Sequence, residues 1–252
     1  MNKKKFIPIA KEVISLEIRA LQNLKKNINS SFVEAVMQIS KCQSKVILCG
    51  VGKSGIIASK IAATLASVGS PSFYLSASEA SHGDLGMISK KDILILISNS
   101  GETSELKNII QFANRNKILL IGVVSKKDSI LYKASDIKLL IPKVIEAEGI
   151  VPTSSTTAQL ALGDALAISS MKFKKFGKLD FKKIHPAGNL GAQLKTVEDI
   201  MLIGDKIPFI NENIKMKDAL KVLSQKKLGV LIVQNKRKKT IGIITDGQIR
   251  RF

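Results

Sequence analysis

The chain has 252 residues, of which 45% are hydrophobic and 24% are charged, a composition ordinary for a folded globular protein. This length allows one large core, or one core and a small additional module. No apolar run approaches the roughly 18 residues that cross a membrane, and the basic first residues lack the apolar stretch of a signal peptide. The only two cysteines, Cys42 and Cys49, do not form a disulfide framework. We therefore expect a cytoplasmic protein with no membrane association.

The formal net charge is +20, which raises the question of a nucleic-acid partner. The lysines are spread along the chain, tryptophan is absent, and aromatic residues make up only 4%. Stacking platforms for bases are therefore scarce. We interpret most of the charge as a solvated surface that favours anionic substrates, and we expect no nucleic-acid partner.

Residues 1–42 have the pattern of two amphipathic helices. Ile14, Ile18, Leu21 and Leu24 recur at helical spacing. The segment is short for a DNA-binding domain followed by a linker. We expect these helices to pack on the main sheet or on a partner subunit.

Buried strands and helices alternate over the next hundred residues. Each strand is a short apolar run bounded by turn residues, as in a parallel sheet buried on both faces. The pattern predicts an α/β fold with a doubly wound, five-stranded parallel sheet. The expected strands are 46–49, 72–75, 93–97, 118–124 and 136–141.

The first strand ends in a glycine-rich turn, residues 50–55, that satisfies G-x-G-x-x-G. A dinucleotide site would need an acidic residue at the end of the second strand, and Ser76-Ala77-Ser78 stands there instead. What remains is a tight turn that lets a ligand approach the backbone, with Lys53 beside it. A polar loop after the second strand holds His82, and it should lie at the same edge of the sheet.

The third strand runs directly into the polar segment 98–105. Asn99 followed by Glu102 predicts that a helix begins there, and free N–H groups at a helix start attract anions. The abundance of hydroxyls suits a phosphate ester better than a carboxylate. The alternative is a serine-rich helix cap that binds nothing. The hydroxyls belong to Ser98, Ser100, Thr103 and Ser104.

After the fifth strand come two acidic residues, Glu146 and Glu148, and then a Thr/Ser-rich stretch. Thr156 and Gln159 predict a helix start, and the apolar helix 157–171 should be buried. Residues 196–252 change in character and have the pattern of a separate α+β unit, with a helix near 216–226 and strands at 229–233 and 240–244.

Taken together, these motifs resemble the sugar isomerase (SIS) domain of arabinose-5-phosphate isomerases. The string Glu79–Gly86 and the His-Pro-x-Gly element narrow the resemblance to the isomerase. The tail from Thr196 resembles a cystathionine-β-synthase-type (CBS) module, one where the family usually carries a pair. The other matching motifs are Gly50–Gly55, Ser98–Glu105 and Pro152–Thr157, in that order.

The resemblance implies an SIS isomerase domain over 1–195, with the helices of 1–42 at its start, and a single CBS-like module over 196–252. It implies interconversion of D-arabinose 5-phosphate and D-ribulose 5-phosphate, which supplies the precursor of 3-deoxy-D-manno-octulosonate for lipopolysaccharide or capsule. A homotetramer is expected, as in the family. Another SIS isomerase, such as a phosphoheptose isomerase, and a non-catalytic phosphosugar sensor are the alternatives.

The resemblance also assigns roles to residues. The catalytic set falls on Lys53, Glu105, Glu146 and His185, and Glu148 competes with Glu146 because the loop before Pro152 is shortened. Phosphate contacts fall on Ser98, Ser100, Thr103 and Ser154, with Thr153 as a further candidate. Other substrate contacts fall on Gly52, Ser54 and His82.

An aldose–ketose isomerisation through a cis-enediol explains why these residue types are needed. A carboxylate removes the C2 proton and returns it at C1, and Glu146 is assigned that role. A cation near the carbonyl oxygen stabilises the enediolate, and Lys53 fits. His185 would open the sugar ring or shuttle hydroxyl protons, and Glu105 would orient Lys53 or share the proton transfer. The scheme requires no cofactor and no metal.

Overall fold

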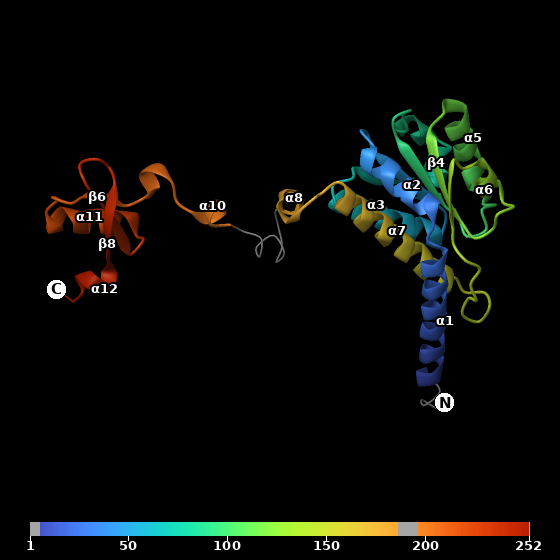
Figure 1. The fold of residues 1–252 in the computed structure, drawn as a ribbon, viewed down its shortest axis with the longest axis horizontal. Helices are drawn as coiled ribbons and strands as arrows, with labels where there is room; N and C mark the ends of the chain where they lie inside the picture. Colours follow the sequence, from blue (N-terminus) through green and yellow to red (C-terminus); the bar gives the residue numbers. More distant parts are fainter. Residues whose placement is uncertain (1–5, 186–195, 252) are drawn as a thin grey trace. The chain divides into compact units, whose positions relative to one another are not determined.

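A computed structural model describes residues 6–185 and 196–251 of the chain (Figure 1). The chain divides into two compact units, residues 1–191 and 192–252, and each is described by itself. The domain boundary expected from the sequence falls a few residues later, between residues 195 and 196, and that position stays a prediction. No helix among the described residues is long and apolar enough to cross a membrane.

The first unit is built on a five-stranded parallel sheet, as the alternation of strands and helices predicted. The strand order is β2-β1-β3-β4-β5, and every neighbouring pair is parallel. The predicted strand boundaries are correct to within one or two residues. The strands are β1 (Val46–Gly50), β2 (Ser72–Ser76), β3 (Ile93–Ile97), β4 (Leu119–Val124) and β5 (Ile137–Leu140).

Helices cover both faces of this sheet, so the alternating side chains of each strand enter two different cores. One core lies under α2 (Ser30–Lys41), α3 (Lys53–Ser67) and α7 (Ser154–Phe173), and it takes Leu48 of β1 and Ile95 of β3. The other lies under α5 (Lys107–Asn116) and α6 (Ile130–Ala134), and it takes Cys49 and Leu96. Burial raises the pKa of the Cys49 thiol to about 12, so this cysteine serves as a core residue.

The helices α3 and α7 pack side by side and run parallel to each other (Figure 1). Lys60 pairs with Asp164, and farther along, Lys174 Nζ donates to Ser70 Oγ at 2.7 Å. The later residue of the first segment pairs with the later residue of the second, so the two helices run in the same direction. At Gly163 a Cβ would overlap the side chain of Ile61, so the two helices approach closely. The first turns of α3 and α7 therefore lie at the same end of the unit.

The N-terminal segment forms α1 (Phe6–Asn27), followed by α2. Two predicted helices are thus confirmed, but their apolar positions are not all buried. Leu24 is buried against the core, whereas Ile14 and Ile18 are exposed in the single chain. The contact of α1 with the rest of the unit is made mainly with α7, where Thr157 Oγ1 donates to Glu17 Oε1 at 3.1 Å.

At the amino edge of the sheet, Asp92 forms the centre of a compact polar cluster. The residue is 2% exposed, and its carboxylate accepts hydrogen bonds from Ser44 Oγ at 2.6 Å and Ser89 N at 2.7 Å. Lys45 Nζ lies 2.9 Å from Oδ2. Although burial acts to raise the pKa of Asp92, the hydrogen bonds from Ser44, Ser89 and Lys45 lower it overall. The cluster joins the β1 and β3 ends of the sheet.

The second unit contains a three-stranded sheet and a packed helix, α11 (Met216–Lys226). The strands β6 (Phe209–Asn211) and β7 (Val230–Gln234) are parallel, and β7 pairs antiparallel with β8 (Thr240–Thr245). The predicted α+β character and the helix at 216–226 are confirmed, and β6 is an element that the pattern did not reveal. Shorter helices of the chain are α4 (Ala77–Ala80), η2 (Asp84–Met87), η3 (Ser104–Leu106), α8 (Lys178–Ile184), α10 (Val197–Ile200), η4 (Gly204–Lys206) and α12 (Asp246–Ile249).

Candidate active site

A cavity of about 480 Å³ opens at the carboxyl ends of β1 and β2, and Glu105 from the segment after β3 also lines it. In the order β2-β1-β3-β4-β5, the direction of winding reverses between β1 and β3. Open α/β sheets bind their ligands at this reversal, outside the carboxyl ends of the strands. The cavity is therefore where the topology alone predicts a ligand. Its lining residues are Gly50, Val51, Gly52, Tyr74, Ser76, Ala77, Ser78, Ser81, His82 and Glu105.

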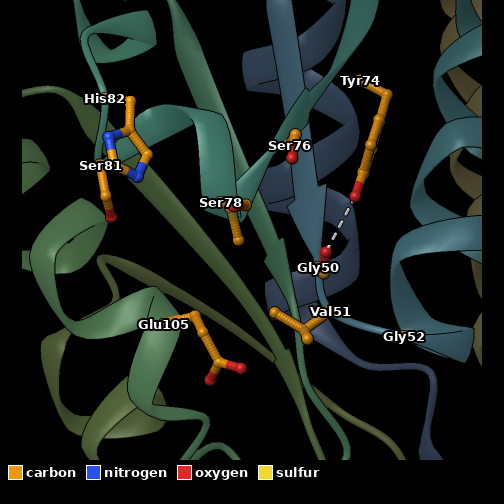
Figure 2. A pocket seen from close by; sticks show the side chains of 10 residues that line it. Gly50, Val51, Gly52, Tyr74, Ser76, Ser78, Ser81, His82 and Glu105 are labelled. Atoms are coloured by element: carbon orange, nitrogen blue, oxygen red, sulfur yellow. Dashed lines mark hydrogen bonds between the residues drawn. The ribbon is translucent and has the colours of Figure 1, made fainter.

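The glycine turn after β1 forms one wall of the cavity (Figure 2). A Cβ at Gly55 would lie 2.7 Å from Gly50 O and 2.8 Å from Tyr74 Oη, so only glycine permits this close approach of helix and strand. Tyr74 Oη donates to Gly50 O at 3.0 Å. Lys53 is the first residue of α3, directly after the lining residue Gly52. The turn thus presents its backbone to the cavity, and Lys53 follows the turn in the chain without itself lining the cavity.

The segment after β3 contains the predicted hydroxyl loop, and its hydroxyls differ in their accessibility. Ser98 is buried, shares a 2.8 Å hydrogen bond with Thr103 Oγ1, and accepts one from Gly101 N at 3.0 Å. Ser100 is half-buried, and its Oγ accepts from Glu102 N at 3.2 Å. Ser98 therefore shapes the loop from inside, while Ser100 stands nearer to solvent.

The expected helix start at Asn99 and Glu102 is wrong. Residues 98–103 form an irregular loop with a bend at 99–101, the 3-10 helix η3 begins at Ser104, and α5 begins only at Lys107. Glu102 Oε1 accepts instead from Ile130 N at 2.8 Å, on the next helix along the chain. A tertiary contact therefore takes the carboxylate that a local capping box would have used.

Glu105 enters the cavity from η3, and its side chain points toward the turn at Val51 (Figure 2). Ser104 Oγ donates to Glu105 Oε2 at 2.7 Å. This hydrogen bond, together with the backbone N–H of Glu105, lowers the pKa of the exposed carboxyl. Glu105 is therefore ionised at neutral pH and faces the turn that carries Lys53.

Glu146 lies in the loop after β5 and is held at the start of α7. Its Oε2 accepts hydrogen bonds from Thr153 N at 2.9 Å and Ser155 N at 3.3 Å. The predicted helix start at Thr156 is therefore late, because α7 begins at Ser154 and a carboxylate from the preceding loop serves as its cap. Gln159, expected to cap the helix, is buried instead.

The two competing glutamates have different environments. Glu146 is half-buried, whereas Glu148 is exposed at the tip of a turn with a positive φ of 52°. Neither residue lines the cavity of Figure 2. Since α3 and α7 run parallel, however, Glu146 at the start of α7 lies at the same end of the unit as Lys53. Ser154, a predicted phosphate contact, is fully buried at the start of the same helix.

The two histidines have different positions. His82 lines the cavity beside Ser81 (Figure 2), so a loop histidine predicted from its place in the chain does reach the pocket. His185 ends α8, where its ring stacks on Phe181 at 3.8 Å and its Nδ1 bonds Phe181 O at 2.9 Å. It does not line this cavity. The rest of the His-Pro-Ala-Gly element, residues 186–188, lies outside the described residues.

Sequence reasoning missed several residues of the cavity wall. Tyr74 belongs to β2, and its strand was recognised, but no pattern indicated that the ring would face the pocket. Burial raises the pKa of the Tyr74 hydroxyl, which keeps it protonated as a donor. Ser76 caps α4 through Glu79 N, and Ser78 and Ser81 follow it. A serine-rich stretch at the carboxyl end of a strand was the available signal.

Comparison with known proteins identifies the family. The SIS domain model matches residues 38–169, and the CBS domain model matches residues 197–252. Arabinose 5-phosphate isomerase KdsD of Yersinia pestis is 43% identical over 249 residues, which cover 98% of this chain and 76% of the relative. The chain belongs to the arabinose 5-phosphate isomerase family. An uncharacterized protein of Rickettsia prowazekii (strain Madrid E) is also 43% identical, over 100% of this chain and 79% of that protein.

Solved structures of this SIS-domain family agree with the fold. The structure of the E. coli CFT073 protein c3406, solved in complex with arabinose 5-phosphate, is 40% identical and superimposes with a TM-score of 0.71. The match covers 74% of this chain and 100% of that one. The SIS fold with a C-terminal CBS module, predicted from the motifs, is thereby confirmed.

Proposed function

We propose that this isomerase-family protein interconverts D-arabinose 5-phosphate and D-ribulose 5-phosphate through a cis-enediol intermediate. The observation that carries the proposal is the identity of 43% to KdsD of Yersinia pestis over nearly the whole chain. The cavity agrees with it, because it joins a glycine turn, hydroxyls and a carboxylate at the ligand-binding edge of the sheet.

The proposed mechanism assigns proton transfer to Glu146. One carboxylate removes the C2 proton of the aldose and returns it to C1, acting first as base and then as acid. Lys53, at the start of α3, stabilises the negative charge that develops on the enediolate oxygen. Glu105, ionised and directed toward the turn, orients Lys53. His185 opens the sugar ring. No step in this scheme needs an electron acceptor.

We propose that the hydroxyl loop holds the substrate phosphate. Ser100 and Thr103 supply hydroxyl donors, and Ser98 sets the loop shape through its bonds to Thr103 and Gly101. Ser154, the first residue of α7, is the further proposed contact; its hydroxyl is buried and has no hydrogen-bond partner among the described residues. Gly52, Ser54 and His82 complete the contacts to the sugar, with Gly52 and His82 lining the cavity.

The wider context is proposed from the family. The product supplies the 3-deoxy-D-manno-octulosonate branch of lipopolysaccharide or capsule synthesis in the cytoplasm, and the working enzyme is a homotetramer. The exposed Ile14 and Ile18 of α1 support an assembly, because large apolar side chains are then covered by another subunit.

The test is turnover of D-arabinose 5-phosphate by the purified full chain without any added cofactor. Formation of ribulose 5-phosphate is the expected result. Sedoheptulose 7-phosphate serves as the competing substrate, and its isomerisation in place of arabinose 5-phosphate would assign the chain to a different SIS activity. Binding of either phosphosugar without turnover would indicate a sensor.

A further inference from the structure

Thr153 joins the loop of Glu146 to α7 through hydrogen bonds with two consecutive loop residues, Glu146 and Ala147. Thr153 N donates to Glu146 Oε2 at 2.9 Å, and Thr153 Oγ1 accepts from Ala147 N at 3.2 Å. The loop is otherwise closed on itself, with Gly149 N donating to Glu146 O at 2.9 Å and an antiparallel bridge between Ala147 and Val151. Thr153 is thus a principal link between this small turn and the main body of the unit.

The first turn of α7 is a rigid support for that link. Ser154 and Ala158 are 0% exposed, and Ser155 is 1% exposed. The same helix packs parallel to α3, whose first residue is Lys53. The position of the Glu146 carboxylate is therefore set relative to the end of α3 through well-packed helices, although the loop itself is irregular.

The carboxylate of Glu146 is held at only one of its two oxygens. Oε2 accepts from Thr153 N and Ser155 N, while in the described part of the chain Oε1 accepts no hydrogen bond. The N–H groups at a helix start favour a negatively charged partner. This arrangement fixes the group in space and leaves the second oxygen available for a proton.

We propose that Thr153 is a positioning residue for the proton-transfer base Glu146, acting through the backbone N–H of Ala147. The inference rests on the proposed function, in which Glu146 moves the C2 proton. The backbone N–H of residue 153 is present with any side chain other than proline. The threonine side chain contributes the hydroxyl, which accepts a hydrogen bond from the Ala147 N–H. Ala147 is only 8% exposed.

Removing the hydroxyl should therefore release the loop without removing the base. Thr153→Val keeps the size and the β-branch but leaves the Ala147 N–H without its acceptor. A base displaced by a fraction of an ångström loses near-attack geometry, and kcat should fall about 10-fold. Thr153→Ser keeps the acceptor and should restore kcat to within about twofold of the wild type. Thr153 is also a candidate phosphate contact, and KM separates the two roles. A positioning role leaves KM nearly unchanged in both variants, whereas a rise in KM of Thr153→Val without a fall in kcat would assign the hydroxyl to the phosphate and overturn the inference.

The decisive measurement is a double-mutant cycle in the full chain. Thr153→Val is combined with Glu146→Gln, and Thr64→Val, whose hydroxyl bonds Lys60 O on α3, is the matched control. If Thr153 acts through Glu146, the valine lowers kcat in the wild type and costs nothing further beside Glu146→Gln. Equal losses in both backgrounds would overturn the inference, as would an unchanged kcat in Thr153→Val.

A second measurement does not depend on turnover. Amide hydrogen exchange should accelerate at Ala147 in Thr153→Val and not in Thr153→Ser or Thr64→Val, while the amides inside α7 keep their protection. Loss of protection throughout α7 would show a general unfolding of the helix and overturn the positioning role. Absence of isomerase activity in the wild-type chain would instead refute the proposed function, so the two failures are distinguishable.

Discussion

The carboxylates at the two edges of the parallel sheet differ in exposure and in hydrogen bonding. At the amino edge, Asp92 is 2% exposed, and its carboxylate accepts hydrogen bonds from Ser44, Lys45 and Ser89. At the carboxyl edge, Glu105 is exposed in a cavity of about 480 Å³ with Ser104 as its side-chain donor. The carboxylate at the amino edge is therefore saturated with hydrogen bonds from the protein, whereas the carboxylate at the carboxyl edge is accessible to a ligand.

This difference separates groups that support the fold from groups that can act on a ligand. A buried carboxylate surrounded by its own donors stabilises the fold, and it has no site left for a substrate. Glu146 is intermediate, since one of its oxygens is bound to α7 and the other is open among the described residues. Substitutions at the two edges should therefore have different consequences, one for turnover and the other for stability.

The largest effect is expected at Glu146. Glu146→Gln preserves size but removes the base, so kcat should fall by on the order of 10²–10⁴ with little change in KM. Solvent deuterium should no longer enter the sugar at C2. Glu148→Gln is the matched control, because Glu148 is exposed at the turn tip. Normal exchange in Glu146→Gln with loss in Glu148→Gln would assign the base to Glu148.

A substitution at the amino edge should lower the stability of the fold. Asp92→Asn keeps the shape but places an amide among donors, so the free energy of unfolding should fall by about 2 kcal/mol, measured by urea denaturation. The kcat of the folded enzyme should stay unchanged. A large loss of kcat with unchanged stability would contradict the separation of the two edges.

The same carboxylate predicts a pH dependence. Because the pKa of Asp92 is lowered in the folded state, its contribution to stability is present above the ordinary aspartate pKa of about 4. That contribution is lost as the pH falls through the lower folded value. The unfolding free energy of the wild type should therefore decrease on acidification more steeply than that of Asp92→Asn. Parallel curves for the two proteins would contradict this assignment.

A smaller effect is expected at Ser100. Ser100→Ala should raise KM roughly tenfold, as for the loss of one hydrogen bond to a charged group worth about 1.5–3 kcal/mol. Ser15→Ala on the exposed face of α1 is the control. A collapse of kcat with unchanged KM would show that Ser100 does not bind the phosphate.

The smallest effect on activity is expected from the second unit. A chain ending at residue 195 keeps the whole sheet and the cavity, whose lining residues all belong to the first unit. Isomerase activity should remain largely intact when assayed beside the full chain. Loss of activity in a folded, soluble 1–195 protein would show that the second unit helps to build the site.

Local sequence determined the strands and the place of the site. Each strand is an apolar run such as Ile93–Ile97, and runs of that kind are recognisable because both faces of a parallel strand are buried. The glycine turn and the hydroxyl loop follow two of these strands directly. Parallel strands bring their carboxyl ends to one edge, so the motifs meet there by topology.

Only the tertiary structure decided how the polar side chains are used. Glu102 and Gln159 have local capping signatures, yet one bonds Ile130 N and the other is buried. The start of α7 is capped by Glu146, whose partners Thr153 and Ser155 lie beyond an irregular loop. Such hydrogen bonds join segments separated by a loop, so no periodic pattern in the sequence predicts them. They depend on how the packing of α3 and α7 positions the loop beside the helix start.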